Sequence, residues 1–346
     1  MVAPRWSRPA SAVRPASAVR PASAVRPQRQ FICWRETCHT FDRCPLTGGT
    51  LQTTSCRSSG RGPALNVTFY GVRGSTPSPC EDNRRYGGNT SCVALEVPGH
   101  EPIVFDLGTG LRYWGSAVAA NGSFRGTALV THLHWDHIQG LPFFTPLHRA
   151  GAELDVLGPT QPGGSLRDTV DFFLRPPYFP VTVTELPGHI GFTELDDDTI
   201  EVGSALVTAI PVPHIGPTNG YRVDWNGISV AYVPDHQQPM DGGMDVDPRV
   251  LELCNGVDLL IHDAQFDEDE FAEKSHWGHC TVDYAVHVAA ESQAKRLVLF
   301  HHDPTHTDPI VDKLLEQSAH LGDRFGIGEV LAAHEGLTIS FTGDDE

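Results

Sequence analysis

From residue 65 onward, apolar and polar residues alternate or gather in short runs, as in a protein built from many short strands. Leu65–Gly71 alternates, whereas residues 128–130 are continuously apolar, as in a strand buried on both faces. Similar runs recur along the chain as far as residue 300. They predict strands at 91–97, 102–107, 154–157, 205–212, 220–223, 228–233, 257–263 and 296–300.

Helical spacing of apolar residues appears in three segments, 166–174, 282–289 and 310–319. Thr281 directly precedes the second segment and is the expected N-cap, because its hydroxyl can accept a hydrogen bond from a free backbone N–H. Strands joined both by hairpins and by helices predict an α/β fold, with two mixed sheets packed face to face and helices outside. No internal duplication is evident, so residues 65–346 are expected to form one domain.

The first 64 residues have a different character. Arg-Pro-Ala-Ser-Ala-Val occurs three times, at 8–13, 14–19 and 20–25, and these repeats have no large apolar side chain with which to build a core. Residues 1–64 are therefore expected to be a disordered Arg/Pro/Ala/Ser-rich extension. Because the next methionine after Met1 is Met240, no internal methionine could start the domain. An upstream-extended start codon, with translation really beginning near Leu65 or Val67, stays open as an alternative.

Composition narrows the protein class. No run of eighteen apolar residues is present, so no membrane span is expected, and the N-terminus lacks the apolar core of a secretory signal. Eight cysteines without a CxxC pair are expected to be mostly free thiols in a reducing compartment, which points to the cytoplasm. Four of them precede the domain at spacings that fit no common zinc finger: Cys33, Cys38, Cys44 and Cys56.

Charge is divided unevenly. Residues 1–66 carry ten arginines, no lysine and two acids, so the remainder holds 15 basic against 41 acidic residues, a net charge of −26. Neutralisation of phosphates dominates the affinity of proteins for long nucleic acids. The acidic body therefore predicts that no long nucleic acid is a partner.

Histidines and an aspartate gather directly after the apolar run 128–130. His132 and His134 alternate along an extended chain and share one face, so both can bind one ion. Asp136 and His137 begin the next element and turn another face, which suits a second ion nearby. A single histidine here would suggest an ordinary loop residue, but this grouping favours a metal site.

Further ionisable residues lie where an apolar strand ends or a helix begins, and such positions can converge at one edge of a sheet. They are His214, Asp235, Asp263, His279 and His301. Together with the first motif, in this order, they resemble the metallo-β-lactamase superfamily, and within it the branch of ribonuclease Z and cyclic phosphodiesterases. The resemblance covers residues 65–346 and implies an αβ/βα sandwich.

The resemblance also implies roles for individual residues. His132, His134 and His214 would bind the first metal ion, and Asp136, His137 and His301 the second. Asp235 would bridge the two ions, while Asp263 and His279 would lie beside them. Imidazoles with a few carboxylates suit two Zn²⁺ ions, with Mn²⁺ or Fe²⁺ as alternatives.

Two such ions about 3.5–4 Å apart lower the pKa of a shared water and clamp both oxygens of an in-line displacement, which favours phosphodiester cleavage. His279, oriented by Asp263, is the expected general acid for the departing alkoxide. The same first motif serves thioester and lactam hydrolases, and a non-catalytic metal-binding protein is a further alternative.

Some positions of this chain differ from the pattern usual in ribonuclease Z, and these differences affect which substrate we expect. That family usually has Glu in place of Asp263 and Ser in place of Cys280, and many members insert a long tRNA-gripping arm where only eleven residues separate Val223 from Asp235 here. We therefore expect a small anionic phosphodiester, either a cyclic nucleotide or a phosphoribosyl cyclic phosphate. The sequence does not distinguish a monomer from a homodimer.

Several neighbouring residues have two interpretations. His262 is either a site residue or a buried packing residue, and Asp106 is expected to hold a ligand loop by hydrogen bonding. Arg73 and Asn89 either reach substrate phosphate or belong to turns. The aromatic segment 172–180 either roofs the pocket or packs against the core. Other candidates for the role of His301 are His302, Asp303 and His306.

Overall fold

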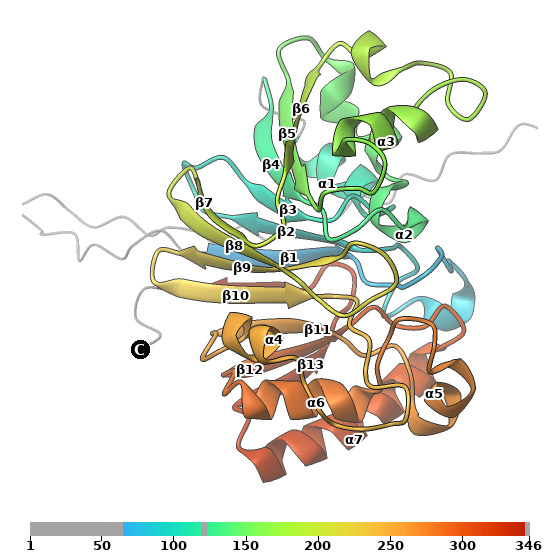
Figure 1. The fold of residues 1–346 in the computed structure, drawn as a ribbon, viewed down its shortest axis with the longest axis vertical. Coiled ribbons are helices and arrows are strands. Elements are labelled where there is room, and N and C mark those ends of the chain that lie inside the picture. The colour runs from blue at the N-terminus through green and yellow to red at the C-terminus, as the bar shows by residue number, and fades with distance from the viewer. Residues whose placement is uncertain (1–64, 119–122, 343–346) are drawn as a thin grey trace, which may run out of the picture. The chain divides into compact units, whose positions relative to one another are not determined.

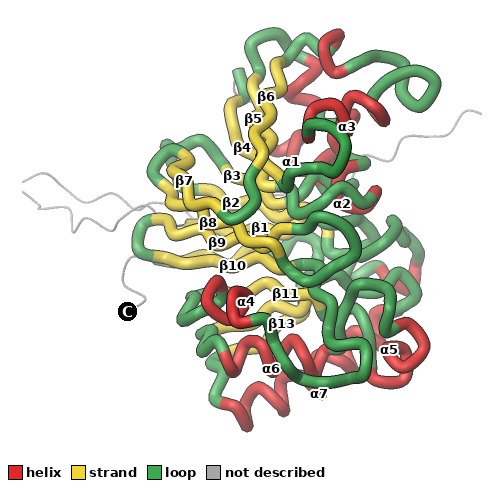
Figure 2. Tube along the Cα trace, viewed as in Figure 1, coloured by secondary structure: helices red, strands yellow, loops and turns green. Residues whose placement is uncertain are grey.

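The computed structural model describes residues 65–118 and 123–342. The expectations for the N-terminal extension and for Cys33, Cys38, Cys44 and Cys56 lie outside these residues, so the domain boundary near residue 65 remains a prediction. In the described part, two mixed sheets pack face to face and helices cover their outer faces (Figures 1 and 2). The predicted α/β sandwich is confirmed.

The first sheet contains seven strands in the order β14-β1-β2-β3-β4-β5-β6. The bounds of its strands are β1 Leu65–Gly71, β2 Cys92–Glu96, β3 Ile103–Phe105, β4 Arg125–Leu129, β5 Glu153–Gly158, β6 His189–Glu194 and β14 Thr338–Phe341. Strands β3 to β6 run parallel to one another. Their carboxyl ends therefore lie at the same edge of this sheet.

The second sheet also has seven strands, in the order β13-β12-β11-β10-β9-β8-β7. The bounds of its strands are β7 Asp198–Val202, β8 Ala205–Pro211, β9 Asn219–Trp225, β10 Ile228–Val233, β11 Leu259–Asp263, β12 Arg296–Phe300 and β13 Glu329–Ala332. Strands β10 to β13 are parallel, and β8 has the same direction because β9 is antiparallel to both β8 and β10.

Helices lie on the two outer faces of the sandwich. Figure 1 shows α1, α2 and α3 on the side of the first sheet and α4, α6 and α7 on the side of the second. The bounds of the helices are α1 Leu111–Val118, α2 Trp135–Ile138, α3 Leu166–Phe173, α4 Pro248–Leu253, α5 Glu268–Lys274, α6 Val282–Glu291 and α7 Asp308–Phe325, and the short 3₁₀ turns are η1 Glu81–Asn83, η2 Leu141–Phe143, η3 Thr145–His148 and η4 Val183–Glu185.

The core has three layers that match this architecture. Between the sheets, aromatic rings from both inner faces meet, and Phe105 stacks on Tyr232 with ring centroids 4.5 Å apart. A second apolar cluster lies under α4, α6 and α7, and a third lies under α1, α2 and α3. Each fully buried ring or branched chain contributes roughly 1.5–3 kcal/mol to folding. This packing fixes the strand ends that carry the site.

Candidate metal centre

The predicted residues come together where strands of both sheets end. His132 and His134 follow β4, and His214 follows β8. Asp235 follows β10, and His301 directly follows β12. These strands end at the same edge of the sandwich, so residues separated by as many as 169 positions converge. The grouping predicted from sequence is therefore present in the structure as a spatial cluster.

One group of three is Asp136, His137 and His301. His301 Nε2 lies 3.0 Å from Asp136 Oδ2 and 3.3 Å from His137 Nε2, and His137 Nε2 lies 3.2 Å from Asp136 Oδ2. Tetrahedral ligands that each sit about 2.0–2.1 Å from an ion are roughly 3.3 Å apart. The three atoms have the separations expected of ligands that share one ion.

The second group is His132, His134 and His214, whose ligand nitrogens all lie within 4.8 Å of one another. His134 Nδ1 and His214 Nε2 are 3.5 Å apart. His132 is buried, and its Nε2 has no hydrogen-bond partner. A buried nitrogen without a partner is costly unless a bound group satisfies it, so this group also fits a cation.

Asp235 lies between the two groups. Its Oδ1 is 3.8 Å from His132 Nε2 and 3.7 Å from His214 Nε2, while its Oδ2 is 3.2 Å from His137 Nε2. The side chain is buried, and neither oxygen accepts a hydrogen bond. An ionised carboxylate in such a place needs compensation by positive charge, and two ions, one on each side, would supply it.

The proton affinities of the histidines differ between the two groups. Burial lowers the pKa of His132 well below its ordinary value, and it lowers the pKa of His214 to about 4. Burial also opposes the charging of His137, but Asp136 and Asp235 outweigh it and raise the pKa of His137 well above its ordinary value. Negative charge therefore acts most strongly on the group that contains Asp136, and Asp235 approaches its member His137 to 3.2 Å.

In His137 and in His214, a hydrogen bond holds the Nδ1 atom, which leaves the Nε2 atom facing the cluster. His137 Nδ1 donates to Asp106 Oδ2 at 2.7 Å, and His214 Nδ1 donates to the Gly278 carbonyl at 2.6 Å. Such partners fix the ring orientation of metal-binding histidines. The role expected for Asp106 matches this geometry, and Tyr232 also donates to the Asp106 carboxylate.

A partner that sequence reasoning missed holds His301. Gln265 is fully buried, and its Oε1 accepts a hydrogen bond from His301 Nδ1 at 2.8 Å. Gly74 packs against this pair so closely that a Cβ there would lie 2.4 Å from His301 Nδ1. Neither residue carries a metal-binding side chain, so no sequence signal pointed to them.

Asp263 and His279 lie beside the cluster. His279 Nδ1 donates to Asp263 Oδ2 at 3.0 Å. The carboxylate is fixed in turn by the backbone N–H groups of His236 and Gln265. His279 also groups with His214 and Asp235 as a potential metal ligand, so its predicted role as an acid needs its own test.

The alternatives considered for neighbouring residues are decided by their contacts. His262 is buried and bonds to His236 and to the Asp263 carbonyl, so it packs behind the site. His302 and His306 turn away, with His302 Nε2 donating to the Ala333 carbonyl and His306 Nε2 bonding to Glu270. His301 alone of this run joins the cluster in the described residues.

Arg73 and Asn89 do not face the cluster. The Arg73 guanidinium is buried and donates to the carbonyls of Gly87 and His306. The Asn89 amide donates to Glu335. Both side chains therefore tie loops together, and the interpretation that they belong to turns fits better than contact with substrate.

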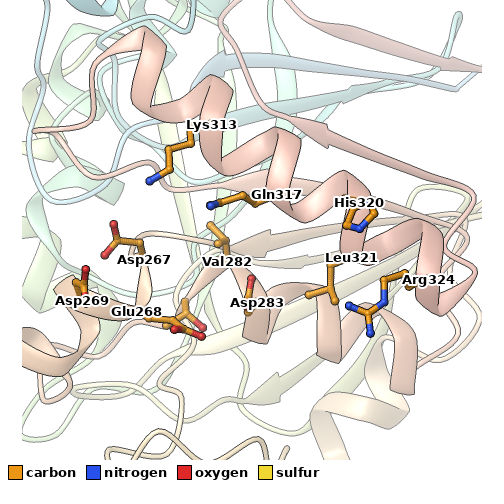
Figure 3. Close-up of a pocket in the computed structure, with 11 residues that line it drawn as sticks. Asp267, Glu268, Asp269, Val282, Asp283, Lys313, Gln317, His320, Leu321 and Arg324 are labelled. Atoms are coloured by element: carbon orange, nitrogen blue, oxygen red, sulfur yellow. The ribbon is translucent and has the colours of Figure 1, made fainter.

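A separate cavity of about 440 Å³ lies between α7 and the amino ends of α5 and α6 (Figure 3). Lys313 and Arg324 line one wall, and Asp269 and Asp283 line the other. The two walls carry opposite charges, so the cavity does not select a ligand of one sign.

Comparison with known proteins identifies the family of the chain. A family described as beta-lactamase superfamily domain matches residues 125–302. A ribonuclease Z of Natronomonas pharaonis is 28% identical over 331 residues, which cover 82% of this chain and 100% of that protein. A ribonuclease Z of Haloferax volcanii is 27% identical, over 82% of this chain and 97% of its own.

Solved structures share the fold. The metallo-beta-lactamase fold protein YhfI from Bacillus subtilis has a TM-score of 0.61 and 18% identity, covering 81% of this chain and 100% of its own. The short form of human tRNase Z has a TM-score of 0.57 and 24% identity, covering 79% and 98%. At these identities the likeness concerns the fold.

The relatives correct one expectation. The acidic net charge predicts that no long nucleic acid is a partner. The relatives from Natronomonas pharaonis and Haloferax volcanii are ribonucleases by name, so this prediction is wrong. Net charge is summed over the whole surface, whereas a nucleic acid contacts only part of it. Bound cations can also offset carboxylates where phosphate approaches.

Two further expectations can be compared with the described residues. None of the helices in 65–118 and 123–342 is long and apolar enough to cross a membrane. The four cysteines in these ranges are free thiols: Cys80, Cys92, Cys254 and Cys280.

Proposed function

The chain belongs to the metallo-β-lactamase superfamily, as a hydrolase of the ribonuclease Z branch, and we propose that it hydrolyses phosphodiester bonds at a centre of two divalent metal ions. The observation that carries the proposal is the Asp235 carboxylate. It is buried without a hydrogen-bond partner between two groups of three ligand atoms. A carboxylate so placed suits a bridge between two cations.

The donor set fits zinc best. His132, His134 and His214 would hold one ion, and Asp136, His137 and His301 the other, with Asp235 shared. Five imidazoles and two carboxylates suit Zn²⁺ first, and they tolerate Mn²⁺ or Fe²⁺. When bound, two such ions activate a water and stabilise the charge that develops on the phosphoryl oxygens.

The remaining chemistry is assigned to the chain's own side chains. Asp263 Oδ2 accepts the Nδ1 proton of His279, which leaves Nε2 as the atom that carries a transferable proton. An alkoxide is a poor leaving group, so a proton delivered from His279 Nε2 speeds its departure. Asp263, held by two backbone N–H groups, positions the imidazole.

RNA and small cyclic phosphodiesters both contain the phosphodiester bond that this centre would cut. The relatives named ribonuclease Z favour RNA. A small cyclic phosphodiester is favoured by the connection between β9 and β10, where only Asn226 and Gly227 separate the strands. This connection leaves no space for a long gripping arm at this position, so small diesters belong in the test beside RNA.

The test is a turnover screen of purified, zinc-loaded protein. We expect hydrolysis of bis-p-nitrophenyl phosphate and of either a precursor tRNA or a cyclic nucleotide, and loss of all of these activities in Asp235→Ala. A thioester and a lactam serve as comparison substrates. Turnover of either comparison substrate without turnover of any diester would overturn the proposal, as would metal-loaded protein that is inert throughout.

A further inference from the structure

Exposed aromatic rings gather beside the metal centre, although large apolar side chains are ordinarily turned inward. Six rings from two segments form what we call the aromatic platform. Its members are Trp135, Phe143, Phe172, Phe173, Tyr178 and Phe179. Four of them expose more than half of their surface: Trp135 61%, Phe143 55%, Phe172 56% and Tyr178 66%.

The rings are held in place by pairwise contacts. Trp135 packs edge to face on Phe173, with ring centroids 5.7 Å apart, and Phe143 packs likewise on Phe179 at 6.0 Å. Phe173 and Phe179 are partly buried and pack against the core under α1, α2 and α3. Each inner ring therefore orients an outer ring, whose surface stays in solvent.

The platform is connected to the candidate metal centre through the chain. Trp135 lies in the chain between His134 and Asp136, one from each candidate metal group. The Trp135 end of the platform therefore lies one residue along the chain from each group.

The charge of the segments that carry the platform favours one kind of bound molecule over another. The two segments that carry the platform, 135–143 and 172–179, contain one arginine, Arg175, and one acid, the candidate metal ligand Asp136, in a domain whose net charge is −26. The Arg175 guanidinium lies over the Phe172 ring, 4.9 Å from its centroid. A second copy of the chain would place arginine against arginine, whereas a polyanion with flat aromatic groups matches both the charge and the rings.

We propose that the aromatic platform stacks the unpaired bases of a single-stranded nucleic acid next to the bond that is cut. This inference rests on the proposed function and names its substrate class. Stacking on aromatic rings is nearly independent of base identity and contributes about 1–3 kcal/mol per base. It therefore supplies part of the affinity for a nucleic acid that an acidic surface does not provide.

The test uses zinc-loaded protein and a fluorescent, phosphorothioate-linked single-stranded RNA of about twelve nucleotides, a length that spans several stacked bases. Phe172→Leu and Tyr178→Leu keep apolar bulk but remove the ring, and each should weaken binding in an anisotropy titration by about tenfold. Trp135→Leu should do the same, whereas Trp135→Phe should retain most of the affinity. Phe325→Leu, at an equally exposed ring at the end of α7, should bind like the wild type.

Wild-type affinity in all three leucine variants would overturn the inference. So would equal affinity of Trp135→Phe and Trp135→Leu, or conversion of a dimer to a monomer by these changes, which would identify a self-association face. Hydrolysis of bis-p-nitrophenyl phosphate separates this result from the proposed function. A protein that cleaves this diester but binds RNA without using the platform refutes the inference alone, and one that binds RNA through the platform but cleaves no diester refutes the proposed function alone.

Discussion

Among individual residues, the ones that sequence could identify are those of types that can bind metals. The motif from His132 to His137 and the later His214, Asp235 and His301 converge as the sequence predicted. The residues that orient them could not be predicted in the same way. Gly278 acts on His214 through its backbone carbonyl, and Gln265 acts through an amide, so neither has a distinctive pattern.

His279 is predicted to deliver a proton and not to bind metal. His279→Ala should keep both ions, and it should slow hydrolysis of a diester with an alkoxide leaving group by roughly a hundredfold to ten-thousandfold. The defect should shrink on bis-p-nitrophenyl phosphate, because p-nitrophenolate departs with little protonic help. Asp263→Asn should give a smaller defect with the same pattern. Loss of an ion from His279→Ala, or equal slowing on both substrates, would assign His279 to metal or substrate binding.

Gln265 is predicted to position His301. Gln265→Leu removes the acceptor of the His301 Nδ1 proton, so zinc affinity should fall roughly tenfold to a hundredfold. Gln265→Glu keeps an acceptor at the same place and should bind zinc nearly as well as the wild type. Competition with a chromogenic chelator measures both affinities. Equal zinc affinity in Gln265→Leu and the wild type would show that the hydrogen bond does not orient the ring.

At the scale of the element, the strands with long apolar runs were predicted well, and β10 and β12 have the expected bounds. Edge strands β7 and β13 were not predicted, because few of their residues are fully buried and the apolar signal is weak. Helix α5 was missed because it is rich in charged residues and buries only Phe271. Sequence pattern reports burial, so elements that bury little remain hidden.

One link between elements has a predictable pH dependence. Asp258, just before β11, accepts hydrogen bonds from Ser229 N at 2.7 Å and from Lys295 Nζ at 2.8 Å. Burial opposes ionisation of Asp258, but the bonds from Lys295 and Ser229 outweigh it and lower the pKa of Asp258 below its ordinary value. A carboxylate with a lowered pKa stabilises the fold above its unfolded-state pKa, and this stabilisation is lost as the pH falls through the folded-state pKa.

Asp258→Asn should therefore lower the free energy of unfolding by about 1–2 kcal/mol at pH 7, which is the scale of hydrogen bonds to a charged group. The difference from the wild type should diminish below about pH 4, where the unfolded carboxyl also becomes protonated. Urea titrations at several pH values measure it. Asp197→Asn, at an exposed turn between β6 and β7, is the matched control and should show little change. A constant difference down to pH 2 would contradict the ionic origin of the effect.

On the scale of the whole molecule, the order of the predicted strands was sufficient to predict the sandwich and the sheet edge at which the site lies. The net charge of the domain was not sufficient to predict the class of substrate, because it does not describe the local surface around the site.

The N-terminal region, residues 1–64, is predicted to be dispensable for folding and turnover. Their repeats contain no large apolar side chain with which to build a core. A chain that begins at Ala64 should therefore keep the melting temperature and diester turnover of the full chain. Loss of soluble, folded protein on this truncation would show that the domain includes part of the N-terminal region.

The number of bound ions tests the central claim most directly. Zinc per chain, measured by plasma mass spectrometry after dialysis of the purified protein, should approach two in the wild type and in Asp258→Asn. Asp235→Ala should lose zinc from both groups, because Asp235 lies within 4 Å of histidines in each. A single tightly bound ion in the wild type, unchanged in Asp235→Ala, would contradict the two-metal centre.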